Sequence, residues 1–386
     1  MKKINILLSI FLFFMMQFHV ISQIAPTSSP YYVDGPYSIT SDSVTVSSKK
    51  VVIYHPVTAP TGVKYPVFIF QPGANGLFSS AINVHSYDLY LKHLAIYGYV
   101  VLVIDETAAG MPNGTTFKAV HDWFLTNVTN TSSLLYTYAD SSKVAIGGHS
   151  NGGVNASGCL VDRPGKIDAI VYFASYPSNN ILVTQDVSGY TGKVLDLAGA
   201  DDQSSKPADC LIGYNSFTSA NCAYWVLITG MDHGGFGDYV NTSQPVGAIG
   251  RTDATATVRH YFVSFLNYIF KNDVVAQSNF ETTVLQPSTT NQFTNSCITT
   301  IIEENYENNF KFYPNPVNNF AQLYSIENIN SFKLIDITGK DVTNYLKTNT
   351  TDIHNFLFDF SDINNGLYLL YIQGNESKPI KINVIH

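Results

Sequence analysis

Apolar and polar positions change in period along the chain, and this change divides the sequence into segments of different structure. Between about residues 43 and 271, short apolar runs typical of buried strands are separated by segments whose apolar residues recur at helical spacing. The strand-like runs are 44–55, 66–71, 100–104, 143–147, 169–173, 194–198 and 224–229. Strands that alternate with helices of about ten to fifteen residues predict an α/β fold, a doubly wound and mostly parallel sheet covered by helices on both faces.

The C-terminal part of the chain follows a different pattern. Residues 272–309 are polar and lack sustained periodicity, so we interpret them as a linker. Residues 310–386 contain short strand-like runs separated by the turn signals Thr338-Gly339 and Asn365-Gly366, which predict a small all-β sandwich. We therefore expect an α/β domain over residues 23–271, a linker and a β domain.

Residues 1–22 have the composition of a secretory signal peptide. Two lysines precede an apolar run from Ile6 to Met16, and small residues lead to a cleavage position before Gln23. The alternative is a membrane anchor, but the run is shorter than the ~20 apolar residues that a span needs. We expect export, followed by removal of this segment.

Composition narrows the classes of partner. Charged residues make up 13% of the 386 residues and the net charge is −8, so no basic stripe is present that could bind nucleic acid. The sequence has no CxxC pair and no HExxH helix, so we expect neither a metal nor another cofactor. We expect a monomer.

The four cysteines fit an oxidising destination, and the sequence leaves three connectivities open. Cys210 and Cys222 lie close in sequence on either side of a polar loop, so we expect them to form a disulfide bond. We interpret Cys159 as a small buried apolar residue.

The segment Gly148-His149-Ser150-Asn151-Gly152 fits the pattern G-x-S-x-G, with an apolar strand before it and a helix-compatible segment after it. A serine held on a tight strand-to-helix turn is exposed to substrate, and glycines on both sides allow the close backbone approach that such a turn requires. The pattern therefore predicts that Ser150 is a nucleophile.

A serine nucleophile needs a base and a group that orients the base, each following a strand in this architecture. Asp201 and Asp202 follow the run 194–198, and His233 follows the run 224–229. We expect His233 to be the base and Asp202 the orienting acid, with Asp201 as the alternative. His149 is interpreted as a packing and hydrogen-bonding neighbour.

Two backbone amides should bind the oxyanion that forms on the substrate. One belongs to Asn151, directly after the nucleophile, and the other is expected at Ala74 in the loop after the run 66–71.

Five stretches of residues 51–270 together resemble an α/β-hydrolase of the cutinase, polyester hydrolase and chlorophyllase group. They are YPVFIFQPGANG (65–76), LAIYGYVVLVID (94–105), GGHSNGGVNASG (147–158), LAGADD (197–202) and MDHGGFGDY (231–239). The resemblance implies a lidless carboxylic-ester hydrolase that acts on small or polymeric esters through Ser150, Asp202 and His233. It also implies that Tyr176 contacts the substrate. Polyester hydrolases usually have an aromatic residue where Ala74 stands, a Met where Asn151 stands and often a Trp where Tyr176 stands.

The C-terminal region is similar to the type A sorting domain of the type IX secretion system. The resemblance rests on FKFYPNP (310–316), KLIDITGK (333–340), NGLY (365–368) and the closing KPIKINVIH. It implies interaction with that secretion machinery and a secreted or cell-surface location. The alternative for this region is a carbohydrate-binding or adhesive sandwich.

We therefore expect an exported serine ester hydrolase. The alternative of a different class is a surface adhesin or binding protein built on a hydrolase scaffold, which would not need all three of Ser150, Asp202 and His233.

Overall fold

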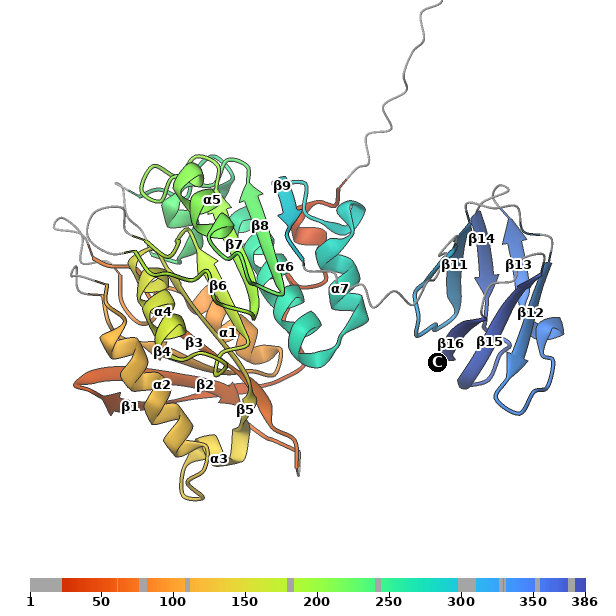
Figure 1. Cartoon of the computed structure of the whole chain (residues 1–386), viewed down its shortest axis with the longest axis horizontal. Coiled ribbons are helices and arrows are strands. Elements are labelled where there is room, and N and C mark those ends of the chain that lie inside the picture. The colour runs from red at the N-terminus through yellow and green to blue at the C-terminus, as the bar shows by residue number, and fades with distance from the viewer. Residues whose placement is uncertain are drawn as a thin grey trace, which may run out of the picture. The chain divides into compact units, whose positions relative to one another are not determined.

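The computed structural model describes residues 23–60, 62–75, 82–107, 112–178, 184–239, 244–297, 310–325, 329, 331–350, 355–373 and 379–386 (Figure 1). The chain forms two compact units, the first ending at Ser296 and the second beginning at Cys297, except that Asn267–Gln277 group with the second. The expected signal peptide lies outside the described residues. Within the described residues, no helix has the length and apolar character needed to cross a membrane.

The first unit is built on a nine-stranded sheet in the order β1-β2-β4-β3-β5-β6-β7-β8-β9. Its strands are β1 (Ile39–Val46), β2 (Lys49–Pro56), β3 (Tyr65–Gln71), β4 (Val100–Ile104), β5 (Ala139–His149), β6 (Ala169–Phe173), β7 (Lys193–Gly199), β8 (Cys222–Ile228) and β9 (Thr290–Asn295). The six strands from β4 to β8 in this order are parallel, whereas β1, β2 and β9 pair antiparallel at the edges. The predicted α/β class is confirmed.

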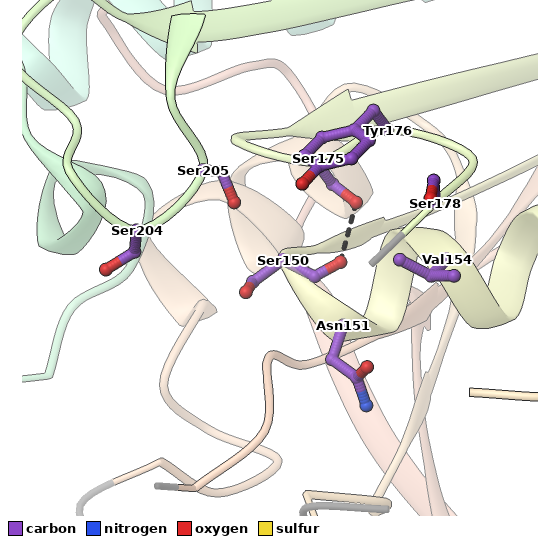
Figure 2. A pocket seen from close by; sticks show the side chains of 8 residues that line it. All are labelled: Ser150, Asn151, Val154, Ser175, Tyr176, Ser178, Ser204 and Ser205. Atoms are coloured by element: carbon purple, nitrogen blue, oxygen red, sulfur yellow. Dashed lines mark hydrogen bonds between the residues drawn. The ribbon is translucent and has the colours of Figure 1, made fainter. Parts of the chain in front are cut away.

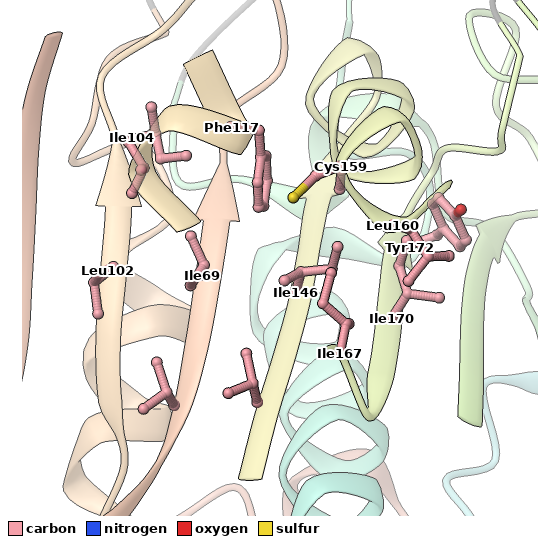
Figure 3. Close-up of a cluster of buried hydrophobic side chains, with 14 of the residues drawn as sticks. Ile69, Leu102, Ile104, Phe117, Ile146, Cys159, Leu160, Ile167, Ile170 and Tyr172 are labelled. Carbon is pink, nitrogen blue, oxygen red and sulfur yellow. The ribbon is translucent and has the colours of Figure 1, made fainter. Parts of the chain in front are cut away.

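Helices cover both faces of the sheet because the buried strands are apolar on both sides. On one face, Ile69 of β3 and Ile146 of β5 pack with Phe117 and Cys159 of two covering helices (Figure 3). On the other face, Phe68 of β3 contacts Phe262 edge to face. The helices are α1 (Asp88–Ile96), α2 (Thr115–Asn127), α3 (Leu134–Tyr138), α4 (Asn151–Asp162), α5 (Pro207–Asn215), α6 (Gly250–Lys271) and α7 (Val274–Glu281), with short 3₁₀ turns η1 (Pro26–Ser28), η2 (His233–Phe236) and η3 (Thr283–Leu285). Successive side chains of one strand therefore point to opposite faces of the pleated sheet, and each packs into the core on its own face.

The linker interpretation of residues 272–309 is wrong for residues 274–295. This segment contains α7, η3 and β9, and β9 pairs with β8 as an edge strand of the sheet. Most side chains of β9 are exposed, with Phe293 packed against Tyr261 and Phe280. A solvated edge strand needs few apolar residues, which explains why the composition of this segment resembles that of a loop.

The expected bond between Cys210 and Cys222 is also wrong, because Cys222 is bonded to Cys297 instead. Cys222 begins β8, and the antiparallel register that places Tyr224 opposite Asn295 continues to place Cys222 opposite Cys297. Cys210 is a buried free thiol on α5, and Cys159 is a buried free thiol as expected. Pairing across the sheet edge, rather than distance along the chain, selects the partner.

The second unit contains two antiparallel sheets, in the orders β10-β11-β14-β13 and β12-β15-β16. Their strands are β10 (Phe310–Tyr313), β11 (Phe320–Ser325), β12 (Ser331–Asp336), β13 (Lys347–Thr350), β14 (Asn355–Asp359), β15 (Gly366–Gln373) and β16 (Ile380–Val384), and η4 (Thr343–Tyr345) follows β12. Leu323 and Phe358 from one sheet share a buried cluster with Leu334 and Leu370 from the other. The side chain of Asn315, in the tetrad YPNP, forms two hydrogen bonds to the backbone of β16. It donates to the Lys381 carbonyl and accepts from the Asn383 amide.

Candidate active site

Ser150 lies on a strained turn between β5 and α4. Its φ of 52° and ψ of −125° place a non-glycine residue in a backbone region that costs energy and is concentrated at functional sites. The backbone is held there because the Ser150 amide donates to the Phe173 carbonyl at 3.1 Å. The hydroxyl of Ser175 donates to the Ser150 carbonyl at 2.6 Å (Figure 2). The turn places Ser150 directly before the first residue of α4, where Ser150 lines a cavity.

Only glycine fits at Gly148 and Gly152 of the motif, because other parts of the backbone lie too close for a side chain. A Cβ on Gly148 would overlap the backbone of Gly152, and a Cβ on Gly152 would overlap the carbonyl oxygen of Gln71. The second contact brings the start of α4 against the loop after β3, which carries Ala74. The turn at Ser150 and the expected oxyanion loop are therefore neighbours.

Asp202 and His233 form a buried pair at the carboxyl ends of β7 and β8. The Oδ2 atom of Asp202 lies 2.8 Å from Nδ1 of His233, and neither side chain is more than 2% exposed. The Oδ1 atom accepts from the amides of Ser204 and Ser205 at 2.7 and 2.8 Å. Because a carboxylate only accepts hydrogen bonds, the proton of a neutral His233 is on Nδ1, which leaves Nε2 available as a base.

Asp201 does not take this position. Its side chain is exposed, and its backbone amide donates to the Met231 carbonyl at 3.0 Å. The geometry thus favours Asp202 over Asp201 as the partner of His233.

A buried chain of hydrogen bonds runs from the expected oxyanion loop through Tyr87 to His149. The Gly73 amide donates to the hydroxyl of Tyr87 at 3.1 Å, and this hydroxyl lies 2.7 Å from Nδ1 of His149. The His149 ring packs on His233, with their centroids 4.4 Å apart. Burial lowers the pKa of His149 well below its usual value, and a charge on His233 lowers it further. His149 is therefore a neutral neighbour of His233, in line with its interpretation from the sequence.

The two expected oxyanion amides are available for a ligand. The amides on either side of Ala74 are used within the protein, by Tyr87 for Gly73 and by the Thr107 carbonyl for Asn75. The amide of Ala74 itself has no partner among the described residues. Asn151 is the first residue of α4, and such amides have no partner within a helix.

The loop that carries His233 is clamped by residues that sequence reasoning missed. Arg251 at the start of α6 donates to the carbonyls of Gly234 at 3.0 Å, Gly235 at 3.3 Å and also Gly237. The hydroxyl of Tyr90 adds a bond of 2.7 Å to the Gly235 carbonyl. No pattern in the sequence around His233 signals this role of Arg251, because its partners are backbone carbonyls.

A cavity of about 130 Å³ opens beside Ser150. Figure 2 shows its lining, which is mostly hydroxyl-bearing: Ser150, Asn151, Val154, Ser175, Tyr176, Ser178, Ser204 and Ser205. A second cavity of about 90 Å³ shares Tyr176 and Ser178 with the first. Burial raises the pKa of Tyr176 to about 12, so its hydroxyl is neutral. Tyr176, expected to contact substrate, lies between the two cavities.

Ser150 adjoins His149, which packs on His233, but the described residues include no hydrogen bond between Ser150 and His233. Such bonds are often long without substrate and tighten when it binds. Within the described residues, no cluster of three or more His, Cys, Asp or Glu side chains is arranged to hold a metal ion.

Comparison with known families agrees with this architecture. Residues 67–249 match the α/β-hydrolase family, and residues 311–386 match a secretion system C-terminal sorting domain. No curated protein matches the chain. The sorting domain implies interaction with the type IX secretion machinery. The chain therefore carries an α/β-hydrolase domain followed by a C-terminal sorting domain, which indicates export and a secreted or cell-surface location.

Proposed function

We propose that the chain is an exported serine hydrolase that cleaves carboxylic-ester bonds, small or polymeric, in the manner of the cutinase-like group. The observation that carries the proposal is the buried pair of Asp202 and His233, 2.8 Å apart, beside a strained turn that presents Ser150. An oriented histidine next to a serine on such a turn is the arrangement that activates a hydroxyl nucleophile.

In the proposed mechanism, Nε2 of His233 accepts the hydroxyl proton as Oγ of Ser150 bonds to the ester carbonyl carbon. The amides of Ala74 and Asn151 bind the oxyanion, and Asp202 stabilises the imidazolium. His233 then donates its proton to the leaving alcohol as the carbon–oxygen bond breaks. Water, activated by the same histidine, hydrolyses the acyl-enzyme and releases the acid.

The first experiment measures hydrolysis of p-nitrophenyl acetate and butyrate by the full chain and by Ser150→Ala. We expect the variant to keep its fold and lose at least ~10³-fold in kcat/KM, because the members of a triad act as a unit. A variant that retains a tenth of the activity would refute the nucleophile. A full chain without esterase activity would favour the binding-protein alternative.

The second experiment separates the two adjacent acids. Asp202→Asn should lower kcat by several orders of magnitude, because an amide can donate to Nδ1 and so favour the wrong tautomer of His233. Asp201→Asn, at an exposed side chain, is the matched control and should remain within about threefold of the unchanged protein. The reverse order of the two effects would transfer the role to Asp201.

A further inference from the structure

The cavity beside Ser150 has a chemical character that bears on the substrate. Of the eight described residues that line it, five are serines and a sixth, Asn151, carries a side-chain amide. Val154 is the one aliphatic residue among these eight. Ligand sites are usually lined mainly by apolar side chains with a few polar groups, so this composition is unusual for a site that takes an alkyl or aryl group.

The position of the cavity relative to the base indicates which part of the ester it holds. His233 does not line the cavity. In the proposed mechanism His233 must protonate the leaving oxygen, so the leaving alcohol lies on the side of His233. The cavity, which is bordered by Tyr176, Ser204 and Ser205 and not by His233, is left for the acyl group.

Two hydroxyls on the wall of this cavity are available for a ligand. Figure 2 shows the side chains of Tyr176 and Ser205 directed toward the same space as Ser150. Neither hydroxyl has a hydrogen-bond partner among the described residues, whereas Ser175 donates to the Ser150 carbonyl and Ser178 pairs with Thr184. An alkyl acyl group would take these two hydroxyls out of water and give them no bond in return, which is unfavourable.

We propose that the acyl group of the substrate is short and carries its own hydrogen-bonding group, as in esters of hydroxycarboxylic acids. This inference rests on the proposed ester hydrolysis and adds the acyl class. A volume of about 130 Å³ is small beside the ~300–1,000 Å³ of sites for drug-sized ligands, so it suits a few heavy atoms better than a long chain or an aromatic diacid. The substrate hydroxyl accepts from Tyr176 and bonds with Ser205.

The test uses two p-nitrophenyl esters that differ in one group: 3-hydroxybutyrate and 3-methylbutyrate. They share the leaving group and have nearly the same shape, because a hydroxyl replaces a methyl group. The rate of each is divided by its hydroxide-catalysed rate, which removes the electronic effect of the hydroxyl. We expect the full chain to favour the hydroxy ester by at least ~10-fold in normalised kcat/KM, since a site built to bond a hydroxyl discriminates against an analogue without one.

Two variants locate the source of this preference. Ser205→Ala and Tyr176→Phe each remove one hydroxyl, and the backbone amide of Ser205 that holds Asp202 is kept. We expect each to reduce the ratio of the two esters at least threefold. Ser142→Ala, an exposed serine in the N-terminal half of β5 and remote from Ser150, is the matched control and should leave the ratio unchanged.

The possible results distinguish the two proposals. A ratio of one or below in the full chain, or a ratio that neither Ser205→Ala nor Tyr176→Phe reduces, overturns the acyl class. If Ser150→Ala still abolishes cleavage of both esters in that case, the proposed function stands. If neither ester is cleaved by the full chain, the proposed function itself fails.

Discussion

His260 provides a quantitative test of the way the first unit is held together. This histidine lies on α6 and is completely buried, with Nδ1 2.8 Å from the Ser29 hydroxyl and Nε2 3.0 Å from the Asn279 carbonyl. It therefore joins the N-terminal segment and α7 to the long helix. Burial lowers its pKa from 6.5 to about 4, with the carbonyl of Asn279 opposing part of the effect.

The sign and size of the consequence follow from proton linkage. The unfolded chain binds a proton at His260 below pH ~6.5 and the folded chain does not until pH ~4, so stability is lost as the pH falls through this window. A tenfold difference in proton affinity between the folded and unfolded chains is worth about 1.4 kcal/mol, which gives a loss of roughly 2 kcal/mol between pH 8 and pH 5 and roughly 3 kcal/mol in total.

The assay compares the free energy of unfolding of the full chain with that of His260→Gln at pH 8 and pH 5. Glutamine can still donate to Asn279 but does not titrate. Both tryptophans, Trp123 and Trp225, belong to the first unit, so their fluorescence in a urea titration reports on that unit. Other titrating groups contribute equally to both proteins and cancel, including buried Asp196, whose raised pKa acts in the opposite direction.

We expect the unchanged protein to lose about 2 kcal/mol relative to His260→Gln when the pH falls from 8 to 5. A difference between the two proteins that stays within ~0.5 kcal/mol over this range would refute the reasoning, because it would mean that burial does not hold His260 neutral.

Further predictions concern the histidine loop and the domain border. Arg251→Met should lower kcat about 100-fold with little change in KM, because a small displacement of His233 from its position is costly. Tyr90→Phe should lower kcat by a smaller factor. An unchanged kcat for ester hydrolysis in Arg251→Met would show that Arg251 does not hold the histidine loop in place. A chain ending after Cys297 should keep the melting temperature of the first unit, whereas a chain ending after Ser288, which lacks β9, should melt at least ~5 °C lower by tryptophan fluorescence. In a host with type IX secretion, the chain ending after Cys297 should remain inside the outer membrane, and its appearance at the cell surface in a fractionation experiment would contradict the sorting role.

The central part of the fold could be predicted from the sequence because its strands are buried on both faces. The apolar runs 100–104 and 169–173 coincide with β4 and β6, in which every residue is buried. Such strands carry the strongest signal that a sequence can hold, since each position must be apolar. By contrast, β9 pairs at the sheet edge with mostly polar residues, and no local pattern separates it from a loop.

The candidate site residues could be proposed from the sequence because the role expected of each depends on its local position. A nucleophile on a strand-to-helix turn, and an acid and a histidine after later strands, can be read along the chain one element at a time. The structure places the Asp202 and His233 side chains in contact and leaves Asp201 exposed. The proposed roles of all the expected site residues stay predictions: Ser150, Asp202, His233, Ala74, Asn151 and Tyr176.

Residues that act across the fold could not be predicted in this way. Tyr87 meets His149 over 62 positions, and Cys222 meets Cys297 because of a strand register that no local sequence pattern encodes. Arg251 binds backbone carbonyls, which are the same for every residue type and leave no mark on the sequence of the loop. Contacts of this kind depend on three-dimensional proximity, whereas periodicity reports only burial.

Covalent labelling of the nucleophile tests the central claim most directly. The folded full chain, treated with a fluorophosphonate, should gain one adduct, and peptide mass spectrometry should locate it on Ser150, because an activated serine reacts and other hydroxyls do not. Ser150→Ala and the urea-unfolded chain should stay unlabelled under the same conditions. An adduct on a different residue, or equal labelling of Ser150→Ala, would contradict the account.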